Sequence, residues 1–246
     1  MELYKETGKL KSGEIRIARP IGALLIKTDR PLGEMANETI TVYVERANGS
    51  NEQIATNQNL KRFILASVFG NSAIETSAGV SALCEICENG AIQLEENEGI
   101  KISLNGLSST HEYQVNGIEY PQLSDEIVRF DTKKVLSEEA SRKFNVQGYE
   151  SVVIEGITAI DEAHVTYENG QTVKYNREEL VAISFDVDPL IGVGSIHQEG
   201  IETGMLVTAV ADTVIFPLVG VTDIDIYKGT GAVTLTLKDE SFQGDF

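Results

Sequence analysis

Hydrophobic and polar positions alternate along much of this chain, with a repeat of two residues. Such alternation is typical of a β-strand that buries one face. It is found in residues 14–19, 39–45, 91–95, 99–104, 205–210, 213–216, 223–227 and 232–237. The pattern therefore predicts a predominantly β protein, with a meander of short strands in its last quarter.

Asn-Gly pairs recur along the chain, several of them next to these segments. Asparagine and glycine tolerate the positive φ angles that tight hairpin turns require. The five pairs are Asn48-Gly49, Asn89-Gly90, Asn105-Gly106, Asn116-Gly117 and Asn169-Gly170. We expect a turn at each of them.

Helical patterns are short and lie between the predicted strands. Residues 59–68 and 176–182 fit short helices, and Asn176 is placed to cap the second of them. Residues 137–144 also fit a helix, because acidic residues precede basic ones as the helix dipole favours. The sequence thus predicts a few short helices in loops.

The two halves of the chain resemble each other at a spacing of 121 residues. Gly49 and Gly170 each follow a predicted strand, and Gly99 and Gly220 each precede one. Two registers that agree indicate a duplicated unit, and half of 246 residues is an ordinary domain length. We predict an N-terminal domain at 1–144, with a basic N-terminal arm and a linker at 120–145, and a C-terminal domain at 145–246.

Charge is unevenly distributed. The 20 basic and 38 acidic side chains give a net charge of −18, yet residues 1–30 hold seven basic and four acidic side chains. An acidic body repels phosphate, so we expect no nucleic acid on the main surface. The basic beginning is typical of a solvated arm; the alternative is an arm that contacts an acidic surface such as lipid headgroups.

Targeting signals are not evident. The chain holds no stretch of 18 apolar residues, and its first six residues are polar, which predicts folding in a cytosol without a transmembrane helix. Cys84 and Cys87 are the only cysteines, too few for a disulfide framework. Their spacing suits zinc or redox chemistry, but the histidines that could complete a zinc site, His111, His164 and His197, are distant in sequence. We expect reduced structural thiols and structural histidines.

Two Asp-X-Asp motifs are candidate metal ligands. On a strand, Asp186 and Asp188 would share one face, as would Asp223 and Asp225. Calcium prefers several oxygen ligands, so these four residues are calcium candidates, whereas the alternative is a solvated acidic face. Paired carboxylates also serve glycoside hydrolysis, but the absence of Trp argues against a sugar-binding cleft. Residues 191–195 form a glycine pattern without the lysine of a phosphate loop.

One combination of features repeats in both halves: a strand, an Asn-Gly turn, a second strand and a Leu-containing helical turn. It is found at residues 41–64 and again at 165–180. This arrangement resembles the double jelly-roll major capsid proteins of tailless icosahedral phages with an internal membrane. The similarity is to the corticovirus and finnlakevirus type, within the lineage that includes adenovirus hexon.

The resemblance implies an all-β fold of two tandem jelly-roll barrels and a structural role without enzymatic activity or cofactors. It implies homotrimers with pseudo-hexagonal outlines that contact neighbouring capsomers, minor capsid or vertex proteins, and the viral membrane through the basic arm. The implied location is the virion shell, assembled in the host cytoplasm. Two other classes stay open from the residues alone: a β-sandwich binding module, such as a phage spike or carbohydrate-binding protein, and a hydrolase that uses Asp186 or Asp223.

Overall fold

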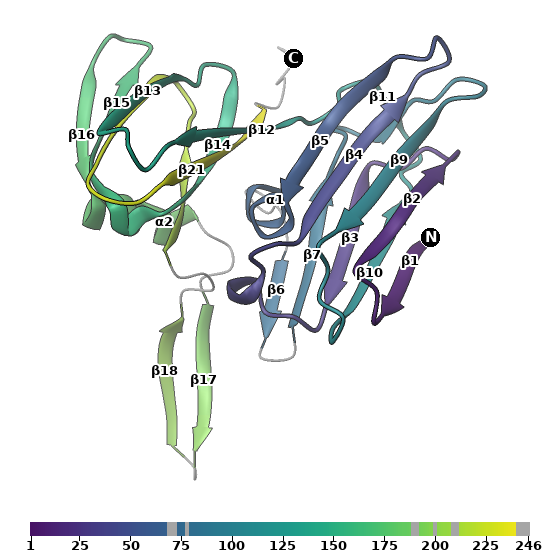
Figure 1. Ribbon diagram of the computed structural model, residues 1–246, viewed down its shortest axis with the longest axis horizontal. Helices are drawn as coiled ribbons and strands as arrows, with labels where there is room; N and C mark the ends of the chain where they lie inside the picture. Colours follow the sequence, from purple (N-terminus) through teal and green to yellow (C-terminus); the bar gives the residue numbers. More distant parts are fainter. Residues whose placement is uncertain (68–72, 77–78, 188–191, 199–200, 208–211, 240–246) are drawn as a thin grey trace.

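Two β-barrels lie side by side in the computed structural model, which describes residues 1–67, 73–76, 79–187, 192–198, 201–207 and 212–239 (Figure 1). The first barrel contains β1 (Glu2–Thr7), β2 (Lys11–Ile17), β3 (Ala23–Thr28), η1 (Leu32–Glu34), β4 (Thr39–Glu45), β5 (Asn51–Asn59), α1 (Leu60–Ser67), β6 (Ala73–Thr76), β7 (Gly79–Glu85), β8 (Ala91–Ile92), β9 (Gly99–Asn105) and β10 (Glu112–Ile118). β11 (Leu123–Ser124) follows and pairs with β8.

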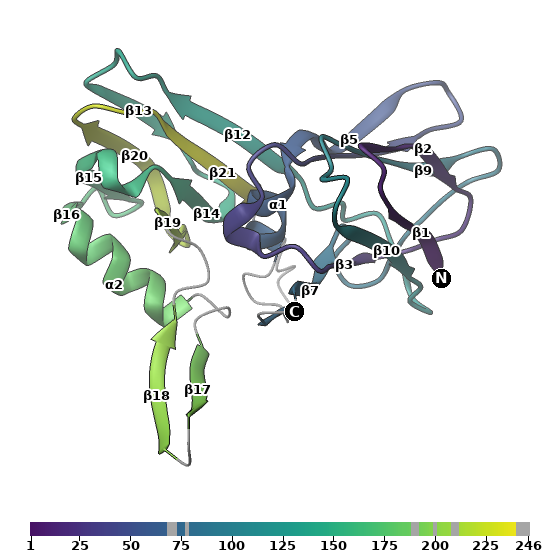
Figure 2. The same cartoon turned by 60° about the horizontal axis from the view of Figure 1, so that its bottom comes forward.

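The second barrel is built from the elements that come next. They are β12 (Phe130–Val135), β13 (Ser141–Asn145), β14 (Tyr149–Glu155), η2 (Ile157–Ala159), β15 (Ile160–Tyr167), β16 (Thr172–Asn176), α2 (Arg177–Val187), β17 (Gly192–Gln198), β18 (Ile201–Val207), β19 (Thr213–Pro217), β20 (Val221–Lys228) and β21 (Val233–Asp239). The β17–β18 hairpin forms a separate two-stranded sheet that projects from the body (Figures 1 and 2).

The strand order is the same in the two barrels. One sheet of the first barrel runs β1-β10-β3-β7-β6, and its counterpart runs β12-β21-β14-β19. The facing strands run β5-β4-β9-β2 in the first barrel and β16-β15-β20-β13 in the second. Apart from β6, each strand of these two sheets therefore has a counterpart at the same position in the second barrel, and each helix follows the same strand pair. The sequence duplication is confirmed as a duplication of topology.

The same backbone hydrogen bond is found at an Asn-Gly turn in each barrel. In the first barrel the Gly49 amide donates to the Arg46 carbonyl, and in the second the Gly170 amide donates to the Tyr167 carbonyl, at 2.9 and 2.8 Å. These residues keep the spacing of 121 predicted from the sequence. Gly49 and Gly170 have φ angles of 81° and 79°, which favour glycine.

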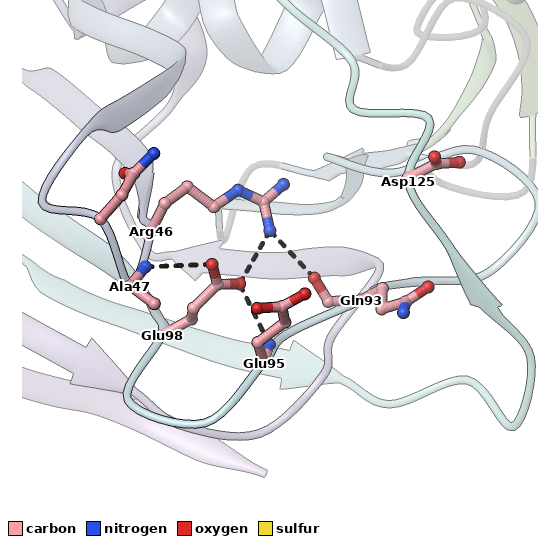
Figure 3. Close-up of a pocket in the computed structure, with 7 residues that line it drawn as sticks. Arg46, Ala47, Gln93, Glu95, Glu98 and Asp125 are labelled. Atoms are coloured by element: carbon pink, nitrogen blue, oxygen red, sulfur yellow. Dashed lines mark hydrogen bonds and ion pairs between the residues drawn. The ribbon is translucent and has the colours of Figure 1, made fainter.

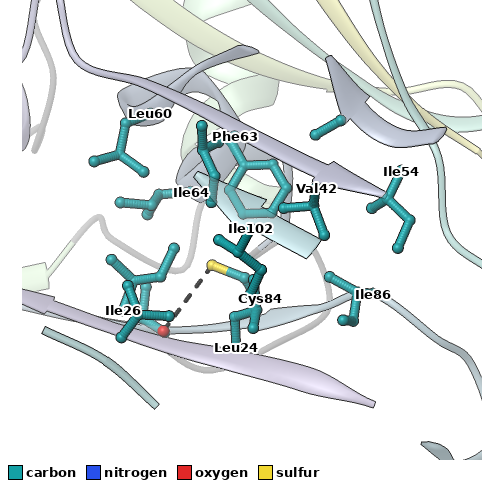
Figure 4. Packing of buried hydrophobic residues seen from close by; sticks show 14 of the residues in the cluster. Leu24, Ile26, Val42, Ile54, Leu60, Phe63, Ile64, Cys84, Ile86 and Ile102 are labelled. Atoms are coloured by element: carbon teal, nitrogen blue, oxygen red, sulfur yellow. Dashed lines mark hydrogen bonds between the residues drawn. The ribbon is translucent and has the colours of Figure 1, made fainter. Parts of the chain in front are cut away.

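Each barrel has its own hydrophobic core. The first core collects buried side chains from β3, β4, β7 and β9 around α1, including Leu24, Val42 and Phe63 (Figure 4). The second core begins at Val135 and ends at Leu237. Alternate residues of strands such as β4 and β9 point into the first core, as the two-residue pattern predicted.

Several predictions within the first barrel and the linker are wrong in detail. The predicted helix 137–144 is replaced by turns and by β13, which pairs with β20. The predicted strand 91–95 is ordered as a strand only over β8. Asn116 and Gly117 lie inside β10 and form no turn. Residues 2–28 supply three strands, so the predicted basic arm is part of the barrel.

The limits 1–144 and 145–246 stay a prediction, although the strand pairing favours an earlier division. Strands β12 and β13 precede residue 145 but pair with β21 and β20 of the second barrel. Among the described residues, no helix is long and apolar enough to cross a bilayer.

Candidate functional site

The two barrels meet at a joint that combines apolar contacts, hydrogen bonds and ion pairs. A single parallel bridge between Ala55 of β5 and Phe130 of β12 joins the barrels into one eight-stranded sheet. Helix α1 lies beside this bridge, in the angle between the barrels (Figure 1), and contacts β14 and β21 as well as β5 and β7. One helix thus packs against both barrels.

Apolar side chains fill the centre of the joint. Val153 and Ile215 point away from the core of their own barrel and belong to the first core instead. The rings of Phe63 on α1 and Phe130 on β12 are 4.8 Å apart and tilted by 58°. Aromatic pairs in this arrangement add to the energy of burial. The outer face of the second barrel therefore completes the core of the first.

Polar side chains are paired across the same contact. The Gln58 amide donates to the Thr236 hydroxyl at 3.1 Å, and the Thr132 hydroxyl donates to the Gln58 carbonyl oxygen at 2.6 Å. Gln58 and Thr236 are 3% and 0% exposed. Because a buried polar group is costly without a partner, these two bonds specify how β5 meets β12 and β21.

One carboxylate forms ion pairs across the joint. Glu155 at the end of β14 forms ion pairs with Lys61 and Arg62, consecutive residues at the start of α1. The side chains of Lys61 and Arg62 are only 10% and 15% exposed. Burial by itself raises the pKa of the Glu155 carboxyl, but the two cations outweigh it and hold the pKa below its ordinary value. The joint is therefore ionic as well as apolar.

A pocket of about 450 Å³ lies at the end of the first barrel where its hairpin turns meet (Figure 3). Its lining residues are Arg46, Ala47, Asn48, Gln93, Glu95, Glu98 and Asp125. Arg46 forms ion pairs with Glu52 and Glu98 at 2.7 and 3.0 Å. Glu98 also accepts the amides of Ala47 and Glu95, which together with Arg46 lower its pKa. These bonds fasten the loops to each other.

Of the four calcium candidates, the described side chains include only those of Asp223 and Asp225. Asp186 lies in α2 rather than on a strand, and Asp188 lies outside the described residues. Asp223 and Asp225 do share the outer face of β20, as predicted, but Lys143 lies 3.5 Å from Asp223. Within the described residues, no group of three or more His, Cys, Asp or Glu side chains is arranged to hold a metal ion. Both alternatives from the sequence, a calcium site and a solvated acidic face, stay predictions.

The cysteines are buried in the first barrel. Cys84 is fully buried among the side chains shown in Figure 4, and Cys87 is 2% exposed. Burial raises the pKa of the Cys84 thiol to about 12 and that of the Cys87 thiol to about 11. Protonated, enclosed thiols are poor nucleophiles and metal ligands, which agrees with a structural role.

His111 and His164 lie in different barrels. His111 Nδ1 is 3.2 Å from a carboxylate oxygen of Asp29 in the first barrel. His164 Nε2 is 2.9 Å from Glu162 in the second, and its ring lies 4.4 Å from the ring of Tyr227. His197 lies in β17, outside the residues whose side chains are described. His111 and His164 are each bound to neighbouring acidic residues.

The sequence analysis did not single out Glu155, Lys61 or Arg62. The only signal was the position of Lys61 and Arg62 in the first helical turn after Asn59, whose side chain accepts the Arg62 amide at 3.2 Å. Charged residues there are usually solvated, so nothing in the local pattern pointed to a buried contact.

The chain is similar to two solved capsid structures over nearly its whole length. It aligns with the major capsid protein P2 from bacteriophage PM2 at a TM-score of 0.50 and 9% identity, over 99% of this chain and 97% of that chain. It aligns with the major capsid protein of STIV, the Sulfolobus turreted icosahedral virus, at a TM-score of 0.51 and 10% identity, over 97% and 93%.

Sequence comparison adds no relatives: no protein-family model matches the chain, and no curated protein matches it. The similarity is thus structural, and it agrees with the duplicated topology and the joint described above. The predicted all-β fold of two tandem barrels is confirmed, and the chain has the double jelly-roll fold of these two capsid proteins.

Proposed function

We propose that this protein is a major capsid protein whose homotrimers form pseudo-hexagonal capsomers of an icosahedral virion shell. The observation that carries the proposal is the fixed pairing of two topologically equivalent barrels in one chain, in the fold of the PM2 and STIV capsid proteins. Three such chains supply six equivalent barrels, which is the number that sixfold packing in a shell requires.

The joint supports this role physically. A threefold ring needs heterologous interfaces that close, and closure depends on a constant angle between the two barrels of each chain. The shared sheet, the buried Gln58 bonds and the Glu155 ion pairs all oppose a change of that angle. A flexible linker between the barrels would permit open chains of subunits instead.

The remaining features of the proposal follow from the shell role. We propose a protein without enzymatic activity or cofactor requirement, located in the virion after assembly in the host cytoplasm. Its partners are other copies, neighbouring capsomers, and minor capsid or vertex proteins. Because residues 2–28 supply three strands, contact with a viral membrane would use the exposed Lys9, between β1 and β2, and Lys11, at the start of β2, rather than a free arm.

Size-exclusion chromatography with light scattering tests the proposal directly. We expect a particle of three times the chain mass of 26.8 kDa at micromolar concentration, and six-lobed particles by negative-stain electron microscopy. A monomer at all concentrations and salt conditions, with no larger assembly, would refute the shell role. A β-sandwich binding module would instead show a monomer that retains a specific ligand.

A further inference from the structure

The joint inside one chain provides a template for contacts between chains. On the outer face of the second barrel, Val153 of β14 pairs with Ile215 of β19 and with Thr236 of β21. This row of three residues is 0–1% exposed, because α1 of the first barrel contacts β14 and β21, and Val153 and Ile215 belong to the core of the first barrel. Glu155, two residues beyond Val153, meets Lys61 and Arg62 at the start of that helix.

The first barrel has a row of the same kind on the equivalent strands. Leu25 of β3 pairs with Leu83 of β7 and with Asn116 of β10. These strands have the same rank in the first barrel as β14, β19 and β21 have in the second. In the part of the chain that the structure describes, however, all three side chains remain partly exposed. The position that α1 fills on the second barrel is thus not filled to the same degree on the first.

Lys27 takes the place of Glu155 in this comparison. Glu155 pairs with Thr234 and Thr213 on the neighbouring strands, one step beyond the apolar row. Lys27 pairs with Gln114 and Ser81 at the same step and is exposed. The two barrels therefore present opposite charges at equivalent positions.

The charges on the two helices differ in the opposite sense: α1 is basic and α2 is acidic at equivalent positions. Each begins after an asparagine that caps the third residue following it: Asn59 accepts the amide of Arg62, and Asn176 accepts the amide of Glu179. Aligned on these caps, Lys61 and Arg62 of α1 correspond to Glu178 and Glu179 of α2. The side chain of Glu178 is 73% exposed, whereas that of Lys61 is 10% exposed. Helix α2 thus carries acidic residues where α1 carries buried basic ones.

We propose that α2 of one copy packs on the outer face of the first barrel of the next copy, with Glu178 against Lys27. This inference rests on the proposed trimer and names its contact. Repetition of the joint around a ring places α2 over the Leu25–Leu83 row, just as α1 covers the Val153–Ile215 row. The contact again contains an ion pair, but here the acidic residue lies on the helix and the basic residue lies on the sheet.

The reversed charges also exclude incorrect pairings. If α1 of one copy met the first-barrel face of another, Lys61 and Arg62 would oppose Lys27. If α2 met the second-barrel face, Glu178 would oppose Glu155. Like charges in a partly buried contact are costly, so each helix is compatible with only one of the two faces. Subunits are thereby prevented from exchanging joints during assembly.

Charge exchange tests the contact. We expect Lys27→Glu and Glu178→Lys each to weaken trimer formation at least tenfold, measured as the protein concentration at half-assembly by light scattering. The double variant should recover most of the loss, because the ion pair is restored with its sign inverted. Glu178 is chosen over Glu179 because Glu179 Oε2 also accepts the Asn176 amide and supports the helix start.

A matched control separates this contact from a general effect of charge. Lys174→Glu makes the same change as Lys27→Glu at an exposed position of β16 and should leave assembly unchanged. Circular dichroism confirms folding of each variant. A trimeric wild type whose assembly is insensitive to both single variants, or a double variant no better than the singles, would overturn the inference alone. A monomeric wild type would overturn the proposed function as well.

Discussion

Removal of the Glu155 carboxylate is the sharpest test of the joint within one chain. Glu155→Ala leaves Lys61 and Arg62 in a mostly enclosed contact without their shared partner. Breaking a buried ion pair typically costs 3–5 kcal/mol, whereas an exposed pair contributes about 0–1 kcal/mol. Glu155 itself is 27% exposed, between these limits. We therefore expect a loss of about 2 kcal/mol in the free energy of unfolding.

For a chain of this size, a loss of that magnitude lowers the melting temperature by about 4–8 °C. Urea denaturation and calorimetry measure it, and Glu112→Ala is the control because Glu112 and its partner Lys5 are 44% and 47% exposed. A loss no greater than that of the control would refute the argument that the joint is ionic. Separation of one calorimetric transition into two would show that the barrels unfold independently once Glu155 is gone.

The effect also has a defined dependence on pH. Because the pKa of Glu155 in the folded protein lies below its ordinary value, the ion pairs stabilise the fold above about pH 4.3, the value for an unperturbed glutamate. Their contribution is lost as the pH falls through the folded pKa. The difference in stability between wild type and Glu155→Ala should therefore shrink in acid, and a difference that is constant down to pH 3 would contradict this assignment.

Three further predictions concern single features. Asn176→Ala removes the side-chain oxygen that caps α2 and should cost about 1 kcal/mol in urea denaturation, with Asn176→Asp retaining most of the stability; an unchanged midpoint would contradict the cap. Cys84 and Cys87 should react with a thiol reagent only after denaturation, because both are buried and protonated at neutral pH; fast labelling of the native protein would show that the barrel opens. Calcium should not change the melting temperature relative to a chelator, because Lys143 already pairs with Asp223; a rise that Asp223→Asn abolishes would establish a calcium site.

The local chemistry of turns and caps could be predicted from the sequence because it depends on neighbouring residues. Asn169 accepts the Gln171 amide at 2.9 Å, and Asn48 accepts the Ser50 amide at 2.8 Å, as expected of asparagine in a tight turn. The cap at Asn176 was predicted on the same basis. Because these signals depend only on neighbouring residues, they are visible in the sequence of each half. Their spacing of 121 residues then indicated the repeat.

Asn116 and Gly117 show where local rules fail. Gly117 lies in a strand, and a Cβ atom there would come within 3.1 Å of the Ile21 side chain. The glycine allows close packing at this point and does not adopt a positive φ angle. A dipeptide alone does not distinguish these two uses, so the sequence predicted a turn that does not exist.

The predicted helix at 137–144 failed for a related reason. Its order of acidic and basic residues suits a helix, yet Phe144 is 7% exposed in β13 and packs in the second core. Pairing with β20 supplies more burial and hydrogen bonding than one exposed helical turn could. Contacts with residues about 80 positions away determine the structure of this segment. Local propensity does not depend on such contacts and could not predict it.

The same limitation explains why the joint could not be predicted, and why the linker matters to it. Glu155 is 94 residues from Lys61, and only the fold brings them together. In the second barrel, β12 and β13 correspond to β1 and β2 of the first. The connection between the barrels is therefore confined to residues 119–129. Even this segment is bound to the first barrel, through the β8–β11 pair and a bridge between Cys87 and Ile127. Separate domains usually move relative to each other unless their interface is large and apolar. Here a shared sheet, a shared helix and an anchored linker act together, so the chain has the properties of one rigid unit with two equivalent faces, which is what a closed ring of subunits requires.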